Sequence, residues 1–213
     1  MPDYYPVFLN LKGRTCLVIG GGEVAARKAN MLVQSGARVV VISPRFNKGI
    51  KSMAERGEIE IENHPFEPGD LEGIFLVIAA TSDTEVNQQV AVEAERRSIL
   101  VNVVDTPSQG NFIVPSVVHR GGLTIAISTG GKSPALARKL RQELEKNFAP
   151  RYAILLELAS QVRRDLLSRG KHMAAEAWQA ALDEELLELI DRGEIGLARE
   201  RLLANLEKWT RSG

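Results

Sequence analysis

The residues with the clearest chemical potential are three consecutive glycines that follow a short apolar run, Thr15–Ile19. Together with Ala25 they match the G-x-G-x-x-G/A pattern of a loop that binds the pyrophosphate of a dinucleotide. In this pattern Gly20 permits the tight turn, Gly22 lets the backbone approach the pyrophosphate, and Ala25 packs the next helix on the sheet. The helix N-terminus adds free N–H groups and the positive end of its dipole. The predicted cofactor-binding residues here are Gly20, Gly21, Gly22, Glu23 and Val24.

A glycine-rich turn can also occur without any ligand, so the surrounding elements decide its interpretation. A second apolar run over residues 38–43 is typical of a parallel strand that is buried on both faces. Dinucleotide sites usually carry an Asp or Glu near the end of this strand to bind the ribose hydroxyls. This chain has Ser43, Pro44 and Arg45 instead. Ser43 can bind a hydroxyl and Arg45 can bind a 2′-phosphate, so these three predicted cofactor contacts leave NAD and NADP both open.

The next strong strand pattern, residues 75–80, ends in Thr81-Ser82-Asp83. Small polar residues at the carboxyl ends of strands lie where open α/β sheets bind their ligands. We therefore predict that Thr81 contacts the cofactor. For Asp83 two interpretations remain: it is a ligand contact, or it is the N-cap of the helix that runs to Arg97.

Asp105 is the predicted catalytic residue. A strand over residues 100–104 delivers it to the same edge of the sheet as the glycine loop and Thr81. A carboxylate in that position suits a general base. The alternative is that Asp105 only caps the turn before Thr106 and Pro107.

These patterns predict an α/β fold, a Rossmann-type parallel sheet followed by a dimerisation segment and a C-terminal helical domain. The predicted divisions are residues 1–111, 112–149 and 150–213. Apolar stretches at 112–118 and 123–128 have no helix between them, which favours an antiparallel or extended arm that needs a partner. Ser133 and Pro134 are typical of the start of a helix that reaches Asn147. Beyond Pro150, three apolar stripes at helical spacing predict three amphipathic helices.

Composition limits the classes of function that remain. Of the 213 residues 44% are hydrophobic, which predicts a packed core. The formal net charge is zero, so no overall positive electrostatic potential would attract nucleic acid or an anionic membrane. The single cysteine, Cys16, is expected to be buried and inert, and it excludes an internal disulfide. His64, His119 and His172 lack a metal-ligand spacing, so no resident metal is predicted. No run is long enough for a membrane span and no signal peptide is apparent, so a cytoplasmic protein is expected.

Several unrelated motifs recur in register and together indicate a family. They are Phe8-Leu9-Asn10-Leu11, Gly20-Gly21-Gly22-Glu23-Val24-Ala25-Ala26-Arg27-Lys28, Ala79-Ala80-Thr81, Asn102-Val103-Val104-Asp105, Phe112-Ile113-Val114-Pro115-Ser116 and Ser128-Thr129-Gly130-Gly131-Lys132-Ser133-Pro134. In that order and spacing the chain resembles the precorrin-2 dehydrogenase/sirohydrochlorin ferrochelatase family, also found as the N-terminal half of sirohaem synthase. The resemblance covers residues 5–150. Since no methyltransferase domain follows in this sequence, the chain is expected to resemble the stand-alone form of the family.

The resemblance implies NAD-dependent oxidation of precorrin-2 to sirohydrochlorin, and in some members insertion of ferrous iron to give sirohaem. It also implies a homodimer in which the segment after the nucleotide domain is exchanged between subunits. Asp105 matches the functional aspartate of the family's Asn-Val-Val-Asp motif. The substrate carries many carboxylates, so a local group of cations is expected, and Lys132 in the loop is a better candidate than Lys139 or Arg141 on the helix face. The predicted substrate-binding residues are Ser116, Gly130, Gly131, Lys132 and Ser133.

A function from another class also fits the glycine loop, because fold alone does not define activity. A nucleotide-sensing regulatory module can have the same first domain. Such a sensor has no need of a base at Asp105 or of the turn at residues 130–134, and these two features favour the enzyme.

Overall fold

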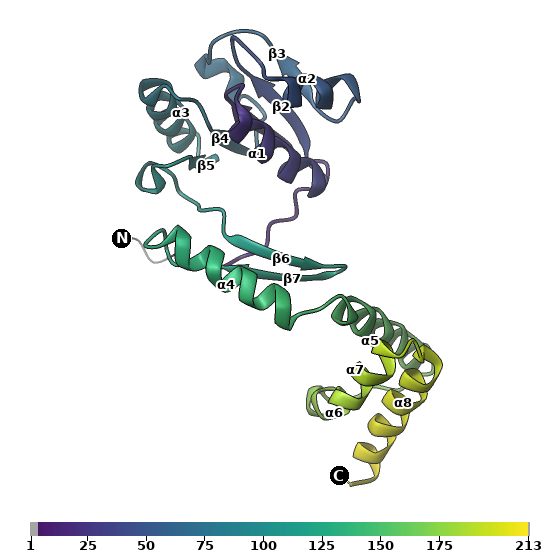
Figure 1. The fold of residues 1–213 in the computed structure, drawn as a ribbon. Helices are drawn as coiled ribbons and strands as arrows, with labels where there is room; N and C mark the ends of the chain where they lie inside the picture. Colours follow the sequence, from purple (N-terminus) through teal and green to yellow (C-terminus); the bar gives the residue numbers. More distant parts are fainter. Residues whose placement is uncertain (1–3, 213) are drawn as a thin grey trace. The chain divides into compact units, whose positions relative to one another are not determined.

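The computed structural model describes residues 4–212 and shows two compact units (Figure 1). The first unit ends at Val114 and the second begins at Pro115. Each unit is described by itself below.

The first unit contains a five-stranded sheet in which every neighbouring pair is parallel. Its strands are β1 (Thr15–Ile19), β2 (Arg38–Ile42), β3 (Glu60–Glu62), β4 (Leu76–Ala79) and β5 (Leu100–Val103), in the order β3-β2-β1-β4-β5. The register places Ile19 beside both Ile42 and Ala79, so the loops after β1, β2 and β4 leave the same edge of the sheet. The predicted Rossmann-type fold is confirmed.

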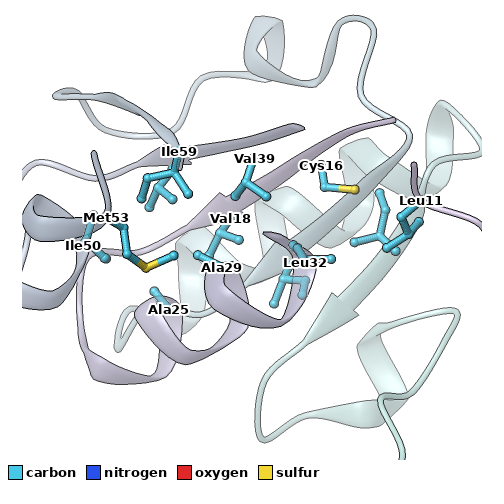
Figure 2. Close-up of a cluster of buried hydrophobic side chains, with 13 residues drawn as sticks. Leu11, Cys16, Val18, Ala25, Ala29, Leu32, Val39, Ile50, Met53 and Ile59 are labelled. Carbon is cyan, nitrogen blue, oxygen red and sulfur yellow. The ribbon is translucent and has the colours of Figure 1, made fainter. Parts of the chain in front are cut away.

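Helices cover both faces of this sheet, which is why β1, β2, β4 and β5 are almost wholly apolar. The helical elements are α1 (Glu23–Gln34), α2 (Lys48–Glu55), the 3₁₀ turn η1 (Pro68–Leu71), α3 (Thr84–Arg96) and the 3₁₀ turn η2 (Pro107–Gln109). Figure 2 shows the first of the two cores, where Ala25, Ala29 and Leu32 of α1 pack with Val18 and Val39 of the sheet. The second core joins the other face to α3 and η1.

Cys16 lies in the first of these cores, as the sequence predicted (Figure 2). Burial raises the pKa of its thiol to about 11, so the thiol stays protonated at neutral pH. Cys16 therefore acts as a small apolar core residue.

The second unit begins with a hairpin of β6 (Ser116–Arg120) and β7 (Leu123–Ile127), which pair antiparallel as predicted. The first strand starts later than the predicted residue 112. Asn102 explains this difference, because its side-chain amide donates to the carbonyl of Phe112 at 3.1 Å and ties that residue to β5. Helix α4 (Pro134–Asn147) follows, and the hydroxyl of Ser133 caps it by accepting from the N–H of Leu136 at 3.2 Å.

The remaining chain is helical, but it forms four helices where three were predicted. They are α5 (Arg151–Ser168), α6 (Ala175–Ala181), α7 (Glu184–Asp191) and α8 (Ile195–Ser212). The expected single helix through Trp178 and Leu189 is interrupted at Asp183, whose carboxylate accepts from the N–H of Leu186 at 3.1 Å and starts α7. Arg201 on α8 holds the same carboxylate at 2.6 Å and keeps its pKa below the usual range, so this break is fixed by tertiary contacts.

Within residues 4–212, no helix combines the length and the hydropathy that a bilayer crossing requires. The same residues contain no group of three His, Cys, Asp or Glu side chains arranged to hold a metal ion.

Candidate active site

The first two glycines of the loop are required by the protein's own packing. Gly20 has φ +131°, and a Cβ there would lie 2.5 Å from the carbonyl oxygen of Ala80. A Cβ on Gly21 would lie 1.7 Å from the carbonyl oxygen of Arg45. The loops after β1, β2 and β4 therefore pack so closely that only glycine fits at these two positions.

Gly22 differs from its neighbours because no contact within residues 4–212 requires a glycine there. Its φ of −88° suits any residue, and a Cβ would meet no atom within 4 Å. Gly22 is also the N-cap of α1 and supplies no side-chain cap, so the first N–H groups of the helix stay available to a ligand. The open space at Gly22 and the free N–H donors at the start of α1 together fit the pyrophosphate of a dinucleotide. Glu23 and Val24 are exposed beside it, where a bound cofactor would reach them.

The segment after β2 is joined to the glycine loop by the backbone. The N–H of Asn47 donates to the carbonyl of Gly21 at 2.8 Å, and the N–H of Gly20 donates to Ile42 at 2.9 Å. Ser43 accepts from the N–H of Arg45 at 3.4 Å, and Pro44 and Arg45 are exposed. The structure thus brings Ser43, Pro44 and Arg45 next to the loop, as a ribose-binding role requires.

Arg45→Ala tests the cofactor preference that the sequence left open. We expect this variant to bind NAD and NADP as tightly as the parent does. Arg45 approaches Gly21 through its backbone carbonyl, which alanine keeps. The Arg45 guanidinium has no ion pair within residues 4–212 that would hold it over a 2′-phosphate. Titration calorimetry with both cofactors measures this. Arg38→Ala is the control, since Arg38 lies at the opposite end of β2. A loss of affinity confined to NADP would show that Arg45 binds the 2′-phosphate.

At the end of β4, Thr81 and Asp83 belong to a local hydrogen-bond network. The Thr81 hydroxyl lies 2.8 Å from the side-chain oxygen of Asn87, and the Asn87 amide donates to the Thr81 carbonyl at 3.0 Å. The Asp83 carboxylate accepts from the N–H groups of Glu85 and Val86 at 3.0 and 3.2 Å. Of the two hypotheses for Asp83, capping is the one observed. Cofactor contact by Thr81 stays a prediction, because its hydroxyl already has a partner in the protein.

Asn87 was missed from the sequence, although its position carries a signal. It is 6% exposed and lies on α3 at helical spacing from the buried Val90, Ala91 and Ala94. A polar residue on an apolar helix face needs a buried partner. The partner here is Thr81, and the pair fixes the loop that follows β4.

Asp105 lies two residues beyond β5, in a turn closed by the N–H of Thr106 and the carbonyl of Val103 at 3.4 Å. Its φ of +63° is left-handed, a conformation that Asp and Asn tolerate better than most residues. The N–H of Val104 donates to Ala79 at 2.9 Å and holds this turn at the cofactor edge of the sheet. The Asp105 carboxylate is exposed and accepts no hydrogen bond from residues 4–212, so it does not cap the turn.

The predicted substrate residues all lie in the second unit. Ser116 opens β6 and pairs with Ile127, so it is at the hairpin end from which the loop before α4 departs. Gly130 and Gly131 have φ of +61° and +80°. The hydroxyl of Thr129 accepts from the N–H of Ser133 at 3.0 Å and donates to its carbonyl at 3.1 Å, which closes the loop.

Among the basic residues near this loop, Lys132 is exposed and has no ion pair within residues 4–212. Arg141 pairs with Glu145 on α4. Lys139 on the same helix is exposed and, like Lys132, has no ion pair within residues 4–212, so the preference for Lys132 stays a prediction.

The fold and the glycine loop define a dinucleotide-binding protein of the Rossmann type. A family model described as "Putative NAD(P)-binding" matches residues 7–116, and the chain belongs to that family. A second model, described as the central part of the sirohaem biosynthesis protein, matches residues 120–147.

The relatives narrow this class further. The sirohaem synthase of Photorhabdus laumondii is 40% identical over 97% of the chain, and that of Nitrosomonas eutropha is 41% identical over 96%. The chain spans 44% of the length of both enzymes. A solved structure, "SirC, precorrin-2 dehydrogenase", has a TM-score of 0.72 and 30% identity, and the match covers 96% of this chain and all of that one. The chain belongs to the precorrin-2 dehydrogenase family, and NAD(P) is the cofactor that its first unit binds.

Proposed function

We propose that the chain catalyses the NAD-dependent oxidation of precorrin-2 to sirohydrochlorin, a step of sirohaem biosynthesis. The observation that carries this proposal is the unpaired carboxylate of Asp105 at the same edge of the sheet as the open position at Gly22. A protein that only senses NAD needs the open position at Gly22 but does not need the unpaired carboxylate of Asp105. Likeness to SirC over 96% of this chain and all of that one supports the same activity.

The oxidation removes a hydride and a proton from the tetrapyrrole, and the bound nicotinamide supplies the hydride acceptor. Gly20, Gly21, Gly22, Glu23 and Val24 would hold the pyrophosphate end of the cofactor, with Ser43 on a ribose hydroxyl. Asp105 takes the proton as general base. Both of its oxygens are free to accept, because the protein gives them no hydrogen bond within residues 4–212.

We further propose that the loop before α4 binds the carboxylates of the substrate. Lys132 supplies an exposed positive charge, and the N-terminus of α4 at Ser133 adds its N–H groups. Gly130 and Gly131 let the backbone approach the ligand, and Ser116 adds a hydroxyl from the same end of the hairpin.

The test is to mix the purified chain with precorrin-2 and to record the absorption spectrum with and without NAD. We expect the spectrum of sirohydrochlorin to appear only when NAD is present. A chain that binds NAD by calorimetry yet leaves the precorrin-2 spectrum unchanged would be a nucleotide sensor.

Insertion of ferrous iron into sirohydrochlorin is a second proposed activity of the same site. The metal enters as pyrrole N–H protons leave, and the two free oxygens of Asp105 suit those protons as well. Ferrous iron is a substrate here, held by the macrocycle itself. Sirohaem formed from sirohydrochlorin and ferrous iron by the parent, but not by Asp105→Asn, would support this activity.

We also propose that the chain forms a homodimer. The side chains of Tyr5 and Phe8 are 86% and 74% exposed in a segment without regular structure, and β6–β7 is a sheet of only two strands. Such surfaces are stabilised by a partner. We expect a dimer at micromolar concentration by light scattering and a monomer for Phe8→Glu. Val92→Glu, at an exposed apolar position on α3, is the control and should leave the dimer intact. A monomeric parent would contradict this proposal.

A further inference from the structure

The loop that presents Asp105 leaves the end of β5 and comes back to the same strand. On its return, the N–H groups of Asn111 and Phe112 both donate to the carbonyl of Val101, at 3.0 and 3.4 Å. Residues 104–110 therefore form a closed loop whose two ends lie on one strand. The Asp105 carboxylate has no hydrogen bond within the described part of the chain, so the backbone of this loop determines where the carboxylate lies.

Asn111 takes the place of a neighbouring strand at the outer edge of β5. Its side-chain oxygen accepts from the N–H of Val101 at 2.8 Å, and its side-chain amide donates to the carbonyl of Ile99 at 3.0 Å. A side-chain amide offers an acceptor and donors much as a peptide group does. Because β5 is the last strand of the sheet, these groups have no strand beside them, and Asn111 pairs with them instead.

Two further contacts fix the return segment, residues 110–112, against β5. The side-chain amide of Asn102 donates to the carbonyl of Phe112 at 3.1 Å, and Asn102 itself is only 7% exposed. A buried amide without a partner destabilises a protein, so the loop supplies the acceptor that Asn102 needs. Gly110 lies so close that a Cβ there would be 2.7 Å from the carbonyl oxygen of Val101. Side chains and backbone thus hold all three residues of the return segment.

The sheet itself does not need the return segment. Strand β4 pairs with the inner edge of β5 along its whole length. Val101 and Val103 of β5 are buried in the second core, with residues of α3. These contacts hold β5 in place without the loop. The hydrogen bonds of Asn102 and Asn111 therefore serve mainly to keep the loop closed, and with it the left-handed backbone at Asp105.

We propose that Asn102 and Asn111 are positioning residues of the active site, which hold the loop of residues 104–110 closed against β5 and so present the Asp105 carboxylate at one place on the cofactor edge. The effect on turnover rests on the proposed function. The closure of the loop is a property of the free protein.

The first test measures amide hydrogen exchange in the free protein, without cofactor or substrate. Asn111→Ala removes the side-chain bonds to β5 at an exposed position, so this variant is expected to fold even where Asn102→Ala does not. We expect the amides of residues 104–112 to exchange at least about tenfold faster than in the parent, while those of β1 keep their rates. Asn102→Ala, where it folds, should affect the same residues.

Asn205→Ala is the matched control. The Asn205 amide is half-buried on α8 and donates to the carbonyl of Ala181 at 3.2 Å, so its loss destabilises the second unit and leaves the first unit alone. Exchange of residues 104–112 should therefore stay as in the parent. Unchanged exchange of these residues in Asn111→Ala would overturn the proposal.

The second test separates positioning from stability. A displaced base loses rate although the cofactor still binds, so we expect Asn111→Ala to lower kcat about 10–100-fold and to keep the KM for NAD. Asn205→Ala should keep both values even if its melting temperature is as low. In the Asp105→Asn background, Asn111→Ala should cause no further loss of kcat.

A further loss in that background, or an equal loss in Asn205→Ala, would show that Asn111 is merely structural. A parent without turnover would refute the proposed function, and hydrogen exchange would still decide whether the two asparagines close the loop.

Discussion

Asp105→Asn should bind NAD like the parent and lose about 10²–10⁴-fold in dehydrogenase turnover. Asparagine keeps the size of the side chain and tolerates the left-handed backbone at φ +63°. The change removes only the basic carboxylate, which makes no hydrogen bond within residues 4–212 that the fold would lose. Sirohydrochlorin formation under saturating NAD measures the loss, and the melting temperature checks that the fold is retained.

Asp83→Asn is the matched control for this experiment. Asp83 also follows a strand at the cofactor edge, but its carboxylate caps α3, and asparagine caps a helix about as well. We expect its turnover and stability to equal those of the parent. If Asp105→Asn also kept its turnover, the catalytic role would be refuted, and substrate positioning would be the most that Asp105 contributes.

Gly22→Val should abolish NAD binding and leave the fold intact. The position has an ordinary φ, and a Cβ would meet no atom of the described residues 4–212 within 4 Å, so valine fits there without a clash. Its methyl groups would instead fill the space through which the pyrophosphate reaches the N-terminus of α1. Calorimetric titration with NAD and the melting temperature are the two measurements.

Two other glycines make this result specific. Gly69→Val adds the same side chain at another open position of the first unit and should leave NAD affinity unchanged. Gly21→Ala should lower the melting temperature, because its Cβ would lie 1.7 Å from the carbonyl oxygen of Arg45. Undiminished NAD binding by Gly22→Val would contradict the assignment of the phosphate loop.

The sheet was predictable because its strands are short apolar runs that end in polar or glycine residues. The N-caps were also predictable where Ser133 and Asp83 precede a helical pattern. The predicted strand ends at Val104 and Ala80 lie one residue beyond the observed ends, although each residue still donates its N–H to the neighbouring strand, Val104 to Ala79 and Ala80 to Ile19. These features depend on local sequence, and local sequence was sufficient for them.

What the sequence did not reveal depends on contacts between distant segments. Gly21 has to be glycine because the carbonyl of Arg45 lies against it, and Asn87 fixes the loop after β4 because it is hydrogen-bonded to Thr81. The break between α6 and α7 at Asp183 depends on the ion pair of Asp183 with Arg201 on α8, and the sequence alone does not show that this pair forms.

The most direct test of the central claim is the stoichiometry of the reaction. Purified chain, precorrin-2 and NAD are incubated without iron, and reduced nicotinamide and sirohydrochlorin are followed together. The account predicts that the two products rise in equal amounts, and that Asp105→Asn slows both to the same degree. Sirohydrochlorin formed without reduced nicotinamide, or neither product formed by a chain that binds NAD, would contradict it.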